Sequence, residues 1–154
     1  MATLRILKHP DPRLREVSQP IVEVTDEVRD LINDMAETMY EARGCGLAAP
    51  QVGINKRIFI IDVSDGKDLK IFINPQILSI EGTQFNNEGC LSFPNVFKKV
   101  KRGTHVHVQA LDINGMLFEL KADGLLAVAI QHETDHLDGV LMIDRKRKLI
   151  LFSE

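Results

Sequence analysis

The pattern of apolar and polar residues predicts two helices. Across residues 26–43, apolar side chains recur at the three- and four-residue spacing of a single helical face. Thr25 is suited to cap the start of this helix, and Gly44 to end it. A second helix is expected after Asp123 and before Gly139, and the first half of that segment is apolar on nearly every face. Such a helix is typically buried at the centre of a domain.

Short β-branched and aromatic runs predict strands between and around these helices. We expect strands at residues 57–62, 70–74, 76–80, 104–111 and 116–120. Asn114-Gly115 is a strong hairpin signal between the last two. Strands with two flanking or enclosed helices indicate an α+β fold, in which mixed or antiparallel sheets surround the central second helix.

The composition is that of a soluble globular protein. A chain of 154 residues fits one domain, residues 1–154, and 44% hydrophobic and 27% charged residues are ordinary values. The net charge of -3 gives no electrostatic case for nucleic-acid binding. No apolar run approaches the roughly 20 residues of a membrane helix, and two cysteines do not make a disulfide framework. We therefore expect a reducing compartment, the cytoplasm.

The second predicted helix contains His132-Glu133-Thr134-Asp135-His136. Two histidines four residues apart lie on one helical face, close enough to bind one metal ion. Glu133 between them could act as the general base on a water molecule at that metal. Titratable groups are costly inside an apolar helix unless they are paired or metal-bound. Ordinary hydrogen bonds among these side chains are the alternative explanation.

Cys90 is the candidate third ligand. A catalytic metal site usually has three protein ligands, and no histidine follows His136. Upstream, the segment Glu88-Gly89-Cys90-Leu91-Ser92 offers a thiolate that would complete a Cys-His-His set and leave a fourth position for water. Alternatively, Cys90 is a small buried hydrophobic residue, as free cysteines often are.

A third segment, Gly44-Cys45-Gly46-Leu47-Ala48-Ala49-Pro50-Gln51, combines small residues with one amide side chain. Gly44 and Gly46 allow another chain or a substrate to approach the backbone closely. The Gln51 amide could donate a hydrogen bond to an oxyanion. A helix C-cap followed by a loop is the alternative interpretation.

Together, the three segments resemble the signature motifs of the peptide deformylase family. The matching residues are Gly44-x-Gly46-Leu47-Ala48-Ala49-x-Gln51, Glu88-Gly89-Cys90-Leu91-Ser92 and Gln131-His132-Glu133-x-Asp135-His136, in the family's order and with fitting separations. The resemblance covers nearly the whole chain and is to a short-tailed bacterial or phage-type member. One departure is Phe97, at a position where longer bacterial members often carry an arginine near the substrate.

The resemblance implies an enzyme that removes the formyl group from N-formylmethionine at the start of new proteins and releases formate. It implies one divalent metal ion, Fe²⁺ in most members with Zn²⁺, Ni²⁺ or Co²⁺ as substitutes, held by Cys90, His132 and His136. Glu133 would then handle the proton, while the Gln51 side chain and the Leu91 backbone N–H would stabilise the oxyanion. The partners would be N-formylmethionyl peptides, including nascent chains at the ribosome.

Substrate-binding residues are expected in the same segments: Gly44, Cys45, Gly46, Glu88, Leu125, Val128 and Ala129. Leu125, Val128 and Ala129 lie one to two turns before His132, and are candidates for the wall of a methionine pocket, with plain core packing as the alternative. The two glycines would let a substrate backbone pair edge-on as an added strand. Cys45 is expected to have no catalytic role.

Two rival functions use the same histidines. A metallopeptidase of the HExxH type would need a third ligand after the helix, where none is well placed. A non-catalytic domain would close a structural metal site with four ligands, and Cys45, Cys90, His132 and His136 form such a set. The basic run at residues 145–148 is expected to be a solvated surface turn.

Overall fold

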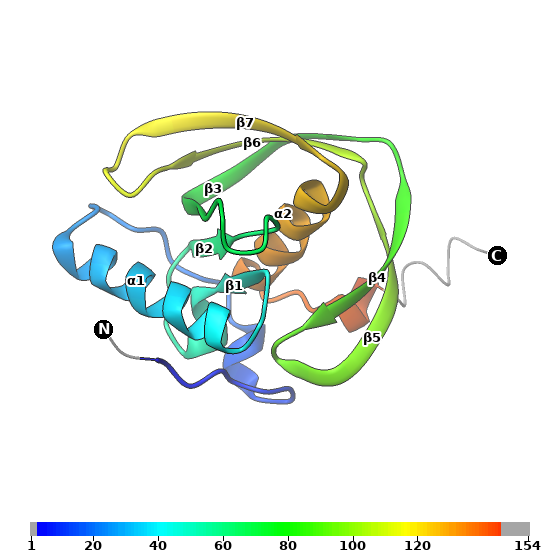
Figure 1. Ribbon diagram of the computed structural model, residues 1–154, viewed down its shortest axis with the longest axis horizontal. Coiled ribbons are helices and arrows are strands. Elements are labelled where there is room, and N and C mark those ends of the chain that lie inside the picture. The colour runs from blue at the N-terminus through cyan, green and yellow to red at the C-terminus, as the bar shows by residue number, and fades with distance from the viewer. Residues whose placement is uncertain (1–2, 146–154) are drawn as a thin grey trace.

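The computed structural model describes residues 3–145 (Figure 1). In chain order, its elements are η1 (Pro12–Arg15), α1 (Asp26–Glu41), β1 (Gly46–Ala48), η2 (Ala49–Val52), β2 (Ile58–Ile61), β3 (Lys70–Glu81), β4 (Gln84–Cys90), β5 (Phe93–Arg102), β6 (His105–Leu111), β7 (Leu117–Asp123) and α2 (Gly124–Leu137). None of the described helices is both long and apolar enough to cross a membrane. The predicted turn at 145–148 lies outside the described residues except for its first residue.

Two antiparallel sheets surround α2. Five strands form one sheet in the order β1-β2-β3-β6-β7, and β4 and β5 form a separate two-stranded sheet. Every pair of neighbouring strands is antiparallel. Figure 1 shows α2 in the middle of the molecule, beneath the curved strands β6 and β7. Helix α1 lies at the left of this view and the β4–β5 hairpin at the lower right. The α+β class is confirmed, and the named strands are antiparallel rather than mixed.

Helix α1 agrees with the apolar spacing, but its end differs from the prediction. Thr25 caps the start, where its hydroxyl accepts a hydrogen bond from the Val28 N–H at 3.4 Å. The residue that takes the left-handed conformation at the end is Arg43, with φ 60°, rather than Gly44. The Arg43 N–H bonds to the Tyr40 carbonyl at 3.0 Å, and the Gly44 N–H to the Met39 carbonyl at 2.9 Å. These two bonds make a Schellman motif.

Strand β3 is a single strand where the sequence predicted two. Its register against β6 shifts between Ile73 and Gln76, at the position of Asn74 and Pro75. Asn74 has φ 51°, and its side-chain amide bonds both the N–H and the carbonyl of Ile21 at 2.7 and 2.8 Å. A bulge therefore absorbs the proline, which cannot donate to the ladder, without ending the strand.

The hairpin of β4 and β5 was not predicted. Its strands are polar at most positions, and two of their buried positions are the charged residues Glu88 and Arg102, 6% and 4% exposed. An apolar alternation therefore does not mark this segment in the sequence. By contrast, the predicted β6–β7 hairpin is present, with Val106, Val108 and Ala110 buried on one face.

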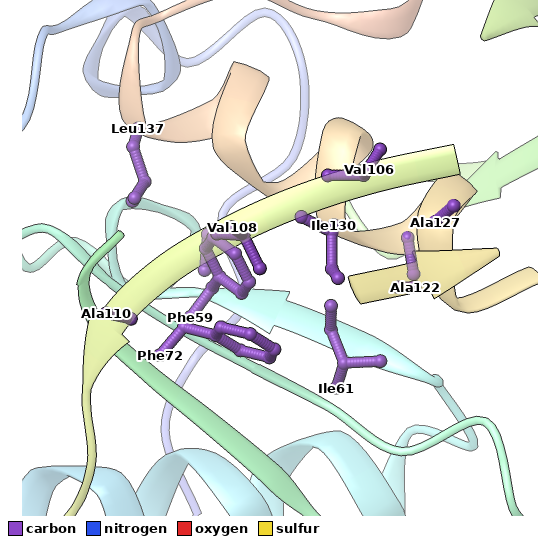
Figure 2. Packing of buried hydrophobic residues seen from close by; sticks show 12 residues of the cluster. Phe59, Ile61, Phe72, Val106, Val108, Ala110, Ala122, Ala127, Ile130 and Leu137 are labelled. Atoms are coloured by element: carbon purple, nitrogen blue, oxygen red, sulfur yellow. The ribbon is translucent and has the colours of Figure 1, made fainter. Parts of the chain in front are cut away.

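The main core lies between α2 and the large sheet. Figure 2 shows Ile130 of α2 pointing towards Ile61 and the rings of Phe59 and Phe72, with Val108 of β6 beside them. Every α2 residue from Ala127 to Leu137 except Thr134 is buried, which confirms the prediction of a central helix. The first turn is more open, because Leu125 is 60% exposed. Burying α2 on all sides places its polar residues inside the protein.

Candidate metal centre and active-site cleft

A cleft of about 640 Å³ opens along one side of the central helix, from its first turn to the segment that carries His132 and Glu133. Its walls come from the segment around β1, from the end of β4 and the following turn, and from one face of α2. The predicted site residues that line it are Gly44, Cys45, Gly46, Gln51, Glu88, Cys90, Leu91, Leu125, Val128, Ala129, His132 and Glu133. His136 lies beside Cys90, with its ring nitrogen Nε2 3.3 Å from the sulfur. The fold thus gathers residues that are far apart in the sequence.

Cys90, His132 and His136 form the group that could hold a metal ion. One nitrogen from each histidine and the cysteine sulfur lie within 4.8 Å of one another. The histidines project from one face of α2, with ring centroids 5.0 Å apart, and Cys90 comes from the end of β4. Within residues 3–145, Cys45 does not belong to this group.

Glu88 orients the first histidine. Its Oε1 atom lies 2.8 Å from Nδ1 of His132. An ionised carboxylate only accepts hydrogen bonds, so Nδ1 is the donor and Nε2 is left for a metal. Burial would raise the pKa of Glu88, but hydrogen bonds from Arg102 and His132 lower it to about 2. Glu88 is therefore ionised at neutral pH and engaged by His132 and Arg102, and its predicted contact with the substrate stays a prediction.

The two histidines differ in electrostatics. Burial lowers the pKa of His136 well below its ordinary value, and the charges of His132 and Arg102 lower it further. Burial also lowers the pKa of His132, but hydrogen bonds to Cys90 and Glu88 outweigh this and hold it well above the ordinary value. A neutral imidazole is the form that binds metals. The two histidines thus lie in opposite electrostatic environments although they share one helical face.

Glu133 faces the cleft from between the two histidines. It is 5% exposed, and its Oε1 atom has no hydrogen-bond partner among the described residues. Burial raises its pKa to about 7. Gly46 of β1 packs against this carboxylate so closely that a Cβ atom there would lie 2.5 Å from Oε2. An unpaired carboxyl group that titrates near neutral pH is suited to general acid–base work.

The Gln51 amide is held in one orientation. Its Oε1 atom accepts a hydrogen bond from the Ala48 N–H at 2.9 Å. Its Nε2 atom therefore points the other way, 3.1 Å from the Ser92 hydroxyl and 3.6 Å from the Cys90 sulfur. The N-terminal segment ties the two walls together, because the Leu7 N–H bonds to the Gln51 carbonyl at 2.7 Å and the His9 N–H to the Ser92 carbonyl at 2.9 Å. A fixed N–H donor beside the metal group is what oxyanion stabilisation requires.

The remaining predicted residues form the mouth and floor of the cleft. Val128 and Ala129 are buried, whereas Leu125 is largely exposed at the mouth. Leu91, whose N–H was predicted to donate, follows Cys90 in the turn after β4. Its side chain packs against Gly44, where a Cβ atom would lie 2.6 Å from Leu91 Cδ1. Gly44 and Gly46 thus allow Leu91 and Glu133 to approach the backbone closely, where a larger residue would collide with them.

Sequence reasoning missed Arg102 and gave Asp135 no role. Arg102 contacts both oxygens of Glu88, through Nε at 2.7 Å and Nη2 at 2.8 Å. Its third nitrogen, Nη1, bonds Asp135 at 2.6 Å. No local signal in the sequence marked Arg102, which lies at the end of the unpredicted strand β5. Asp135 stood within the third motif, and its position three residues after His132 was the available signal.

Comparisons with known proteins identify the family. The polypeptide deformylase family matches residues 3–150. The peptide deformylase of Cellvibrio japonicus is 53% identical over 147 residues, which are 94% of this chain and 86% of that protein. The crystal structure of a Synechococcus elongatus peptide deformylase in complex with actinonin has a TM-score of 0.91 and 44% identity, and covers 93% of this chain and 80% of that one. An Acinetobacter baumannii peptide deformylase bound to Met-Ala-Ser has a TM-score of 0.87 and 31% identity, over 93% and 98%.

These matches decide between the functions left open by the sequence. The metallopeptidase and the structural-metal domain are not favoured, because the relatives are deformylases over most of their length. Among residues 3–145, the group of one thiol and two imidazoles also lacks the fourth protein ligand that would close a structural site. The chain therefore belongs to the peptide deformylase family of metal-dependent hydrolases, which remove the formyl group from N-formylmethionyl peptides.

Proposed function

We propose that Cys90, His132 and His136 hold one divalent metal ion and that deformylation takes place in the cleft beside them. The observation that carries this proposal is the convergence of the three donor atoms within 4.8 Å, next to an unpaired buried carboxylate. The contact between Glu88 and His132 supports it, because histidine ligands usually donate their other ring N–H to a carboxylate or carbonyl.

The donor set fits the metal that the family requires. One thiolate and two imidazoles suit Fe²⁺ and Zn²⁺, and a three-ligand set leaves a position for water or substrate. We propose Fe²⁺ as the native ion, with Zn²⁺, Ni²⁺ and Co²⁺ as substitutes. Such an ion supplies Lewis-acid chemistry, which makes water a nucleophile near neutral pH and stabilises developing negative charge.

Three groups of the chain complete the reaction. Glu133 takes a proton from the attacking water and passes it to the leaving amine, a role that its pKa of about 7 supports. The Gln51 amide and the Leu91 N–H donate to the oxyanion that forms on the formyl oxygen when the formyl carbon is attacked. One well-placed donor of this kind contributes about 3 kcal/mol to transition-state binding. Formate and a free α-amine result.

Substrate recognition follows from the walls of the cleft. Leu125, Val128 and Ala129 offer apolar surface to the methionine side chain. β1 is an edge strand of the large sheet, and Gly44 and Gly46 beside the cleft let the substrate backbone approach and pair with it as an added strand. We further propose that the chain acts as one catalytic domain in the cytoplasm, on nascent chains at the ribosome.

The proposal is tested by an anaerobic assay of the purified protein on formyl-Met-Ala-Ser. The metal content of the same sample is measured. We expect formate release in proportion to the occupied metal, and no cleavage of the peptide bonds of unformylated Met-Ala-Ser. Cys90→Ser should lose metal and activity together. Full activity in metal-free protein, or cleavage of internal peptide bonds instead of formate release, would contradict the proposed function.

A further inference from the structure

Helix α2 has a second polar face that the reaction does not use. Gln131, Thr134 and Asp135 point away from the cleft and line a separate cavity of about 600 Å³. This cavity lies against the junction where β5 passes into β6, at Arg102 and Gly103. The helix therefore carries the metal group on one face and contacts this junction through a neighbouring face.

The backbone of the junction is fixed to the helix by Gln131. The Gln131 side chain accepts from the Gly103 N–H at 2.9 Å and donates to the Gly103 carbonyl at 3.0 Å. Gly103 has no space for a side chain, because a Cβ atom there would lie 2.1 Å from Cγ2 of Ile80. Arg102, the next residue back along the chain, therefore starts from a firmly held position.

The Arg102 guanidinium is buried between two carboxylates. Its side chain is 3% exposed, and it makes a two-point contact with Glu88 on one side. On the other side Nη1 bonds Oδ2 of Asp135 at 2.6 Å. Glu88 in turn bonds His132, so each member of this series orients the next one. Asp135 holds the end of the Arg102 guanidinium that does not contact Glu88.

Arg145 balances the charge of Asp135. It makes a two-point contact with that carboxylate, through Nε at 3.0 Å and Nη2 at 2.7 Å. The series thus contains two guanidinium groups and two carboxylates. Asp135 is mostly buried and Arg145 about one-third exposed, with side-chain exposures of 11% and 34%. Without Asp135 the buried Arg102 would carry an unbalanced charge on this side, which is costly in the interior.

We propose that Asp135, balanced by Arg145, is a positioning residue for the metal site. It fixes Arg102, which fixes Glu88, which sets the ring of His132 against Cys90 and His136. This inference rests on the proposed function, because it assumes that His132 is a metal ligand. It adds a role for a polar residue of α2 that lies beside the ligands and outside the cleft.

Metal affinity is the measurement that separates positioning from plain structural support. Zn²⁺ affinity is measured by competition with a chelator, the visible spectrum is recorded after Co²⁺ loading, and the melting temperature is taken without metal. The variants are Asp135→Asn and Arg145→Ala. Asp138→Asn is the matched control, because Asp138 lines the same cavity and pairs with Arg57 at 2.9 Å but is not part of the series.

We expect Asp135→Asn to weaken Zn²⁺ binding by about tenfold, as removal of groups behind metal ligands typically does. Arg145→Ala should weaken it less, because Asp135 still holds Arg102, and Arg145→Lys should recover part of the loss. Asp138→Asn should bind Zn²⁺ as the wild type does. The Co²⁺ spectrum should change in Asp135→Asn and not in the control.

A double variant tests the route. If Asp135 acts through Glu88, then Asp135→Asn should add little to the loss caused by Glu88→Gln alone. Wild-type affinity in Asp135→Asn with a lower metal-free melting temperature, or fully additive losses, would overturn the proposal. If Asp135→Asn does not fold, unchanged Zn²⁺ affinity in Arg145→Ala would overturn it instead. A wild-type chain that binds no Zn²⁺ would refute the proposed function itself, and this inference with it.

Discussion

Substitution of Gly46 by alanine offers a sharp test of the active-site geometry. The new methyl group would lie 2.5 Å from Oε2 of Glu133, whereas ordinary contacts begin at 3.4 Å. Either the carboxylate or the strand must therefore move by about 0.9 Å. Gly46 does not have a positive φ, so alanine fits the backbone, and such a replacement commonly stabilises a protein by about 0.4–1 kcal/mol through the unfolded state. The expected damage is to catalysis and not to folding.

We expect kcat/KM to fall by roughly 100-fold, the typical effect of a 1 Å displacement of a catalytic group. That loss corresponds to about 2.7 kcal/mol of transition-state binding. The assay is formate release from formyl-Met-Ala-Ser under anaerobic conditions, with metal content and melting temperature measured on the same protein. In the Glu133→Gln background, Gly46→Ala should cost little more, because the group that it displaces is already disabled. A rate within threefold of wild type, or fully additive losses in the double variant, would refute the reasoning.

Three further predictions concern the metal and its neighbours. Glu133→Gln should keep the metal and the fold and lose roughly 10²–10⁴ in kcat; a near-normal rate at full metal occupancy would exclude Glu133 as the acid–base group. Cys90→Ser should weaken metal binding far more than Cys45→Ser, because a hydroxyl replaces a thiolate poorly; equal, mild effects in metal analysis would count against Cys90 as a ligand. The Fe²⁺ enzyme should lose activity rapidly in air and the Ni²⁺ or Co²⁺ enzyme should not, with Cys45→Ser inactivating at the wild-type rate; iron-loaded protein that survives hours of aeration would argue against an exposed ferrous site.

The elements that could be predicted from the sequence are those set by local patterns. Helix α1 and the β6–β7 hairpin bury apolar residues at regular spacing, so periodicity alone locates them. The β4–β5 hairpin could not be predicted from the apolar pattern, because the charged residues Glu88 and Arg102 occupy two of its buried positions. They are stabilised inside the protein by each other and by α2, contacts that exist only once the chain has folded. Strand β3 was divided in the prediction because Pro75 ordinarily interrupts a strand, and the bulge at Asn74 is a tertiary solution.

In the candidate site, too, the features set by local sequence could be predicted and those set by tertiary contacts could not. Titratable residues on the apolar helix α2 stood out, since burial without partners is costly. Gln51 and Glu133 could be named from motifs that resemble the family. Neither the locked direction of the Gln51 amide nor the contact of Gly46 with Glu133 could be foreseen, because each depends on the distance between β1 and its neighbours. Arg102 was invisible for the same reason.

The hydrogen bond between the Ala48 N–H and Gln51 has a consequence for selectivity. It joins the donor beside the metal group to the end of β1, the strand whose edge forms a wall of the cleft. Under the proposed function, a peptide that pairs with β1 is placed in register with that donor. The carbonyl that reaches Gln51 then lies a set number of residues from those paired with the strand. The cleft therefore selects peptides whose formyl group lies at that set distance from the residues paired with β1.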